Sequence, residues 1–105
     1  MDATTAHSLG EKIQIIDVRE DEEWAAGRID GALHIPLAEL PERLGELDAS
    51  RIPVTVCRSG GRSAHAYELL EAAGRNPQDL EGGMQAWAAY GLPITTPDGR
   101  PGHVA

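Results

Sequence analysis

Short apolar segments rich in β-branched residues alternate along this chain with segments typical of helices. The clearest apolar segments are residues 12–18 and 53–57, which have the length and composition of buried strands. A predicted helix over residues 62–73, ended by Gly74, follows the second of them. Strands that alternate with helices indicate βα units and a mainly parallel sheet. We therefore expect an α/β protein in which helices flank a small, mainly parallel sheet.

The weaker elements follow from the same signals. Leucines spaced three, four and three residues apart across 37–47 form one face of a predicted helix, with Pro41 in its first turn. The segment 78–80 is a weak strand candidate because Leu80 is its only apolar residue. The Gly/Pro-rich residues 95–105 are expected to be mobile. The remaining expected elements are helices at 21–26 and 84–90 and a strand at 32–35.

The composition limits the number of domains and the classes of partner. The 105 residues fit a single domain over 1–105, with a core of about 12–94. The net charge of −8 argues against nucleic-acid binding, which depends on cations that neutralise phosphates. No apolar run approaches the roughly 18 residues of a membrane helix. The N-terminal residues lack the basic and apolar regions of a secretory signal, so we expect a cytoplasmic location.

The single cysteine, Cys57, ends a predicted strand, and ligands of parallel sheets bind beyond the carboxyl ends of strands. Two glycines after it let successive backbone N–H groups turn inward as an anion-binding nest, and the next helix points its N-terminus at the same place. Two arginines add positive charge. These features stabilise a thiolate, so the loop suits a nucleophilic cysteine, a bound oxyanion or both. The candidate site residues are Cys57, Arg58, Ser59, Gly60, Gly61, Arg62 and Ser63.

A lone cysteine is also often a small buried hydrophobe. The residues that follow Cys57, Arg-Ser-Gly-Gly-Arg, are poor material for a core and good material for an anion-binding loop, which favours the functional interpretation. No histidine is an evident partner, because His65 is expected on a solvated helix surface and His34 in a structural, apolar setting. The spacing therefore supports neither a Cys–His pair nor a metal site.

Three segments, in this order, follow the pattern of a known family. They are Asp17-Val18-Arg19 with Glu23-Trp24 and residues 27–36 (GRIDGALHIP), the loop 57–63, and residues 80–87 (LEGGMQAW) with 91–93 (GLP). The match covers residues 13–94, and these segments resemble the single-domain type of the rhodanese (thiosulfate sulfurtransferase) domain. Three departures stand out: Arg28 replaces a histidine, the segment after Gly74 lacks the usual aromatic and apolar residues, and the stretch before Lys12 is short. The last departure implies an abbreviated leading strand and helix.

The resemblance implies a three-layer sandwich and a sulfurtransferase without metal or organic cofactor. Cys57 would accept a sulfane sulfur from a donor such as thiosulfate and pass it, from a persulfide, to cyanide or a thiol. The backbone of 58–63 would cradle the persulfide and the oxyanion of the donor, and Asp17 and Arg19 would form an internal ion pair beside the loop. The implied partners are a small-molecule sulfur donor and acceptor, with a sulfur-carrier protein as a further possibility; neither nucleic acid nor a membrane is implied.

Three alternatives remain. A tyrosine-type phosphatase needs an arginine six residues after its cysteine, whereas here Ser63 holds that position and Arg62 comes one residue early. Non-catalytic interaction modules of the same family usually lack the cysteine that this chain retains. A sulfur relay between protein partners would use the same chemistry, and the sequence does not separate it from activity fed by thiosulfate.

Overall fold

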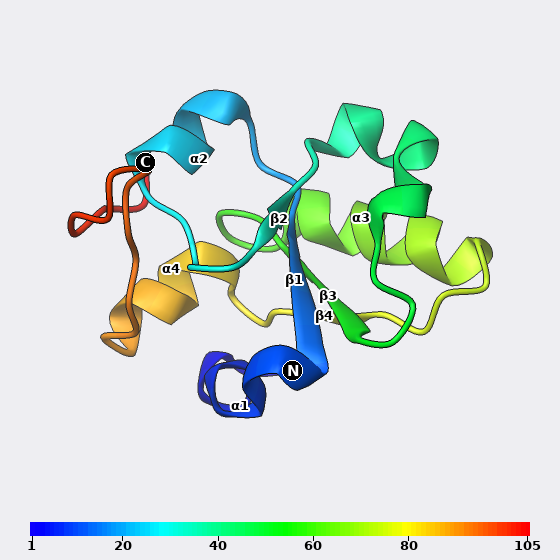
Figure 1. Ribbon diagram of the computed structural model, residues 1–105, viewed down its shortest axis with the longest axis horizontal. Helices are drawn as coiled ribbons and strands as arrows, with labels where there is room; N and C mark the ends of the chain where they lie inside the picture. The colour runs from blue at the N-terminus through cyan, green and yellow to red at the C-terminus, as the bar shows by residue number, and fades with distance from the viewer.

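A parallel sheet of four strands forms the centre of the computed structural model, which describes residues 1–105 (Figure 1). The strands are β1 (Ile13–Asp17), β2 (Leu33–His34), β3 (Ile52–Val56) and β4 (Gln78–Asp79), in the order β2-β1-β3-β4. β1 pairs with β3 over its whole length, from Ile13 opposite Ile52 to Asp17 opposite Val56. All three pairings are parallel, so the carboxyl ends of the strands lie along one edge. The predicted α/β class is confirmed, and so is the weak strand near Leu80.

Successive side chains of β1 pack on opposite faces of the sheet, as the pleat requires. Ile13 and Ile15 join one apolar cluster, and Ile16 joins the other. The first cluster is covered by α1 (Ala3–Leu9) and α4 (Gly83–Ala89), the second by α3 (Gly61–Ala72) and the helical turns of residues 37–46. Helical layers on both faces of the sheet make the expected three-layer sandwich.

Two segments differ from their predictions. The helix predicted over 37–47 is wrong: the chain forms two 3-10 helices, η2 (Leu37–Glu42) and η3 (Leu44–Glu46). An α-helix here would need an amide hydrogen from Pro41 for the carbonyl of Leu37, and proline has none. The apolar face itself is real, because Leu40 and Leu47 are buried.

The N-terminal helix α1 was not among the predicted elements. Asp2 caps it by accepting a hydrogen bond from the Thr5 amide at 2.8 Å. Ala3 and Ala6 are buried against the core and anchor the helix there. A third 3-10 turn, η1 (Gly10–Lys12), joins α1 to β1. The chain therefore keeps a leading helix of seven residues, and no strand precedes β1.

The last residues, for which the composition predicts mobility, follow a path fixed by hydrogen bonds. Thr95 exchanges two backbone hydrogen bonds with Arg28, and the His103 amide donates to the carbonyl of Ala26 at 3.1 Å. Ala26 ends α2 (Asp21–Ala26), so the C-terminal segment lies beside this helix (Figure 1).

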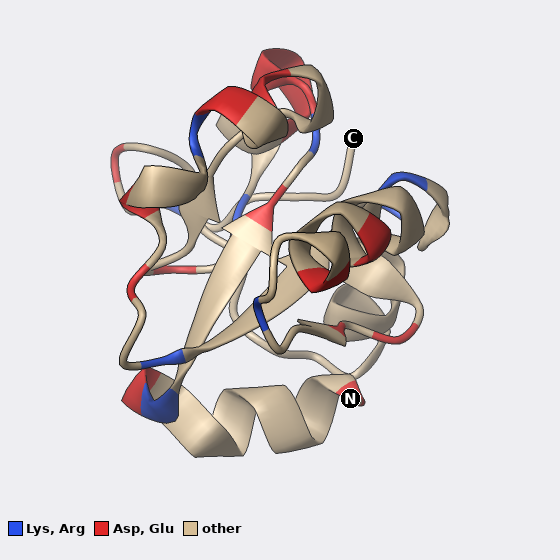
Figure 2. Ribbon diagram, turned by 90° about the vertical axis from the view of Figure 1, so that its right-hand side faces the viewer, with Lys and Arg blue, Asp and Glu red and all other residues tan.

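Charge is unevenly divided between the two signs on this fold. Lys and Arg are fewer than Asp and Glu, and Figure 2 shows the basic residues separated from one another along the ribbon.

None of the helices combines the length and the apolar character that crossing a bilayer requires.

Candidate active site

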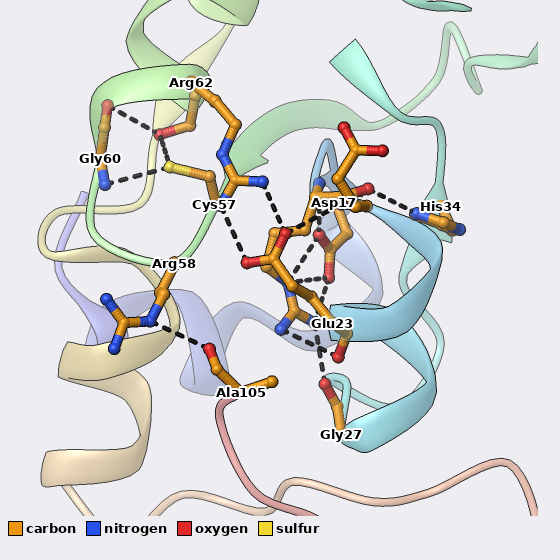
Figure 3. A network of polar contacts seen from close by, with 12 residues as sticks. Asp17, Glu23, Gly27, His34, Cys57, Arg58, Gly60, Arg62 and Ala105 are labelled. Carbon is orange, nitrogen blue, oxygen red and sulfur yellow. Dashed lines mark hydrogen bonds and ion pairs between the residues drawn. The ribbon is translucent and has the colours of Figure 1, made fainter. Parts of the chain in front are cut away.

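Cys57 follows β3 directly, at the carboxyl edge of the sheet and just before α3. Its side chain is enclosed by the loop that connects them, and only 1% of the residue is exposed. The Gly60 amide donates a hydrogen bond to Sγ at 3.0 Å, and the Ser63 hydroxyl lies 3.4 Å from it (Figure 3). Gly60 has a φ of +131°, a conformation that L side chains rarely adopt, so a glycine is needed to aim this amide at the sulfur.

The surroundings of Cys57 favour the thiolate. Burial by itself raises the pKa of the Cys57 thiol, but hydrogen bonds from the Ser63 hydroxyl and from the amides of Ser63, Gly60 and Ser59 outweigh it. The net effect is a pKa below the ordinary value of a cysteine. The thiolate is the nucleophilic form of cysteine, so this sulfur is prepared for attack on an electrophile.

Arg62 binds Glu23 of α2 rather than pointing at the sulfur (Figure 3). Its two terminal nitrogens donate to the two carboxylate oxygens at 2.6 and 2.9 Å, a bidentate ion pair. The hydrogen bond from Arg62 lowers the pKa of Glu23 to about 2. The pair therefore contributes stability above the ordinary pKa of a glutamate, and this contribution is lost as the pH falls toward 2.

The other loop residues take different positions. Arg58 and Ser59 are exposed, and Arg58 turns away from Sγ to donate to the carbonyl oxygen of Ala105 at 2.9 Å (Figure 3). Gly61 is the first residue of α3. The structure thus brings Gly60 and Ser63 to the sulfur, whereas both guanidinium groups are hydrogen-bonded elsewhere.

Asp17 and Arg19 form the buried ion pair that the resemblance implied. The Arg19 Nη2 lies 2.8 Å from Asp17 Oδ2, and neither side chain is more than 1% exposed. The same guanidinium donates to the backbone carbonyls of Gly27 and Glu23, at 2.8 and 3.3 Å. Val18, between the two partners of this ion pair, donates its amide hydrogen to the carbonyl of Val56. The ion pair and its carbonyl partners therefore form a buried frame next to the residue that precedes Cys57.

The Gly82-Gly83 turn supports the loop from the side of α4. The Met84 amide donates to the Cys57 carbonyl at 2.8 Å, and the Gln85 amide donates to that of Arg58 at 3.0 Å. A Cβ at Gly83 would lie 2.4 Å from the Cys57 carbonyl oxygen, so a larger residue there would push the loop aside. The turn therefore supports the backbone of the Cys57 loop.

The surface cavities lie away from Cys57. Neither of the two cavities is lined by a residue of the 57–63 loop. The larger, of about 810 Å³, lies between α1, the turn at 29–31 and the segment 48–51. No group of three or more His, Cys, Asp or Glu residues is placed to hold a metal ion.

Sequence reasoning assigned no role to Glu23, because its partner Arg62 is 39 residues away. Its only signal was its place in the Glu-Trp part of the resemblance. The contact of Arg58 with Ala105 had no sequence signal.

Glu23→Gln is expected to weaken the loop and to change Cys57. The variant keeps the shape of the side chain but loses a charge-assisted pair, which should lower the free energy of unfolding by about 1 kcal/mol after solvent screening. Arg62 interacts electrostatically with Cys57. Without a carboxylate to neutralise it, this positive charge should lower the pKa of the thiol further. Chemical denaturation and the pH dependence of alkylation by iodoacetamide measure the two effects.

The matched control is Glu22→Gln, an exposed glutamate on the same helix. It removes the same charge from α2 without touching Arg62. Equal alkylation profiles for the two variants would contradict a role of the Glu23–Arg62 pair at Cys57.

Matches to a family model, to a sequence relative and to two solved structures identify the family. The sequence model of the rhodanese-like domain matches residues 2–90. A sulfurtransferase of Allochromatium vinosum is 42% identical over 91 residues, which cover 85% of this chain and 84% of that protein. The crystal structure of a rhodanese-related protein from Thermoplasma volcanium superposes with a TM-score of 0.86 at 34% identity, covering 90% of this chain and 95% of that one. A rhodanese-like domain protein from Staphylococcus aureus gives 0.77 at 38% identity, covering 83% and 88% of the two chains. The chain belongs to the rhodanese-like domain family.

Proposed function

We propose that this protein is a sulfurtransferase that moves a sulfane sulfur from a donor such as thiosulfate to a nucleophilic acceptor through a persulfide on Cys57. The observation that carries the proposal is the buried Cys57 sulfur, held by the Gly60 amide and the Ser63 hydroxyl with a lowered thiol pKa. Membership of the rhodanese-like family and the sulfurtransferase among its relatives support it.

The proposed reaction has two displacements. In the first, the Cys57 thiolate attacks the outer sulfur of thiosulfate; a sulfur–sulfur bond to Cys57 forms, the one in the donor breaks, and its electron pair leaves with sulfite. In the second, an acceptor such as cyanide or a thiolate attacks the outer sulfur of the persulfide and returns Cys57 as a thiolate. Both steps balance without an oxidant or reductant.

The loop has a role in each step. The backbone of residues 58–63 faces the persulfide and the leaving oxyanion, as an anion-binding turn at a helix N-terminus does. Ser63, buried beside the sulfur, accepts a hydrogen bond from the Cys57 thiol and donates to the Gly60 carbonyl; once the thiolate forms, its hydroxyl turns to donate to Sγ. Arg62, paired with Glu23, ties the loop to α2 and would bind the donor only by leaving that partner.

The rival functions are less well supported. A phosphatase would need its loop arginine to hold the phosphoryl oxygens, and Arg62 comes one residue early and is paired with Glu23. A non-catalytic module has no use for a cysteine with a lowered pKa. A sulfur relay, with a protein persulfide as donor and a sulfur-carrier protein as acceptor, uses the same Cys57 chemistry and differs only in its partners.

Incubation with thiosulfate is expected to raise the intact mass by about 32 Da, one sulfur atom, at Cys57. Cyanide should reverse the increase, because it removes the outer sulfur as thiocyanate. Intact-mass spectrometry measures both steps, and peptide mapping locates the sulfur. A mass that stays unchanged with thiosulfate and with a small-molecule persulfide, together with turnover of p-nitrophenyl phosphate, would contradict the proposal and favour the phosphatase.

A further inference from the structure

The C-terminal segment, residues 94–105, lies beyond the part of the chain that the family model matches, residues 2–90. It nevertheless packs beside the candidate site. The Gly102 amide donates to the carbonyl of Ile94 at 2.8 Å, which closes the segment into a loop, and the His103 amide donates to the end of α2. Val104, partly buried, packs against the apolar cluster under α1 and α4. The segment is thus anchored in the fold.

Close backbone contact holds this loop against α2. A Cβ built on Gly102 would lie 2.8 Å from the Cα of Gly27 and 2.9 Å from the carbonyl oxygen of Ala26. Real Cβ atoms do not come this close to backbone, so only glycine fits at position 102 while the segment is docked. Gly27 also accepts a hydrogen bond from Arg19, so the docking surface is part of the buried frame of the site.

The segment then reaches the Cys57 loop, where the carbonyl oxygen of Ala105 accepts a hydrogen bond from Arg58 at 2.9 Å. The loop and α2 are therefore joined twice. Arg62 joins them directly through Glu23, and Arg58 joins them through Ala105 and the His103–Ala26 hydrogen bond. In Figure 3 the two arginines extend from the loop in different directions, with Ala105 between Arg58 and the end of α2.

We propose that residues 101–105 form a wall at the Arg58 side of the approach to Cys57 and restrict the reaction to compact sulfur donors. This inference rests on the proposed role of Cys57 as the nucleophile. With 1% of the cysteine exposed and both loop arginines bonded across to α2 or to the segment, a slender reagent reaches Sγ more easily than a bulky one. The donors that fit are small anions and low-molecular-weight persulfides, whereas a persulfide on a folded protein requires the wall to move.

Alkylation of Cys57 by two reagents of different size tests the wall without relying on sulfur transfer. The reagents are iodoacetamide and a maleimide that carries a long polyethylene glycol chain. Gly102→Val should undock the segment, because its side chain meets the backbone of Gly27 and Ala26. We expect the rate with the bulky maleimide to rise by about tenfold or more and the rate with iodoacetamide to change by less than about twofold.

Gly45→Val is the matched control, since Gly45 is exposed and a Cβ there meets nothing within 4 Å. A second variant, shortened after Arg100, removes the wall and retains the Arg28–Thr95 bridge. It keeps the inference testable if Gly102→Val fails to fold. Equal changes with both reagents, or no change in either variant, would overturn the inference. If alkylation depends on reagent size as expected but the protein accepts sulfur from no donor, the inference about the wall is supported and the proposed function is refuted.

Discussion

Cys57→Ser is expected to stop sulfur transfer while the protein stays folded. An alcohol does not ionise near neutral pH and does not carry a sulfane sulfur, so turnover with thiosulfate and cyanide should fall by a factor on the order of 10³ or more. The fold should survive because the hydroxyl fits the space of the thiol and can accept the hydrogen bond from Gly60. Steady-state turnover, intact mass after thiosulfate and the thermal unfolding temperature give the three readouts.

His65→Gln is the matched control for this variant. His65 is exposed on α3, two residues past Ser63, and is the histidine nearest to Cys57 in the sequence. Turnover should be unchanged, because the hydrogen bonds of the loop already lower the pKa of Cys57. Residual turnover of Cys57→Ser near that of the unchanged protein would refute the persulfide mechanism, and a large loss in His65→Gln would mean that the nucleophile depends on a base.

The strands could be predicted because their signals are local. β1 and β3 are short and β-branched, and the structure places them within one residue of the predicted limits. The helix predicted over 37–47 was wrong because leucine spacing reports which face is buried and does not report the hydrogen-bond pattern, which Pro41 decides. α1 was missed because its buried residues, Ala3 and Ala6, are small and give little apolar signal.

The candidate site also combines features with a local sequence signal and features without one. The sulfur, the glycines and the helix N-terminus are adjacent in sequence, so the loop from Cys57 to Ser63 could be recognised as a unit. Its partners come from distant parts of the chain, and they change what the arginines do. Arg62, whose positive charge local reasoning places beside the sulfur, is bonded to Glu23, and Arg58 is bonded to Ala105. That both arginines bind the donor remains a prediction, and binding would require them to leave these partners.

Arg19→Met is expected to lower the free energy of unfolding by about 3–5 kcal/mol, the cost of leaving one partner of a buried ion pair uncompensated. Arg19 is fully buried and donates to Asp17 and to the carbonyls of Glu23 and Gly27. Methionine fills much of the same volume, so the loss comes from the buried carboxylate and the two carbonyls rather than from an empty cavity. Urea denaturation measures this loss. Arg19→Lys keeps the charge but loses the planar guanidinium, so its free energy of unfolding should lie between those of the unchanged protein and Arg19→Met.

Arg43→Met provides the surface counterpart, because the partly exposed Arg43 pairs with Glu39 and Glu46. Its loss should be much smaller, since water screens the pair and solvates the glutamates that remain. Asp17→Asn combined with Arg19→Met removes both charges and should recover part of the stability lost in Arg19→Met alone. A double variant no more stable than that single one would show that the backbone carbonyls, and not the carboxylate of Asp17, are what Arg19 compensates.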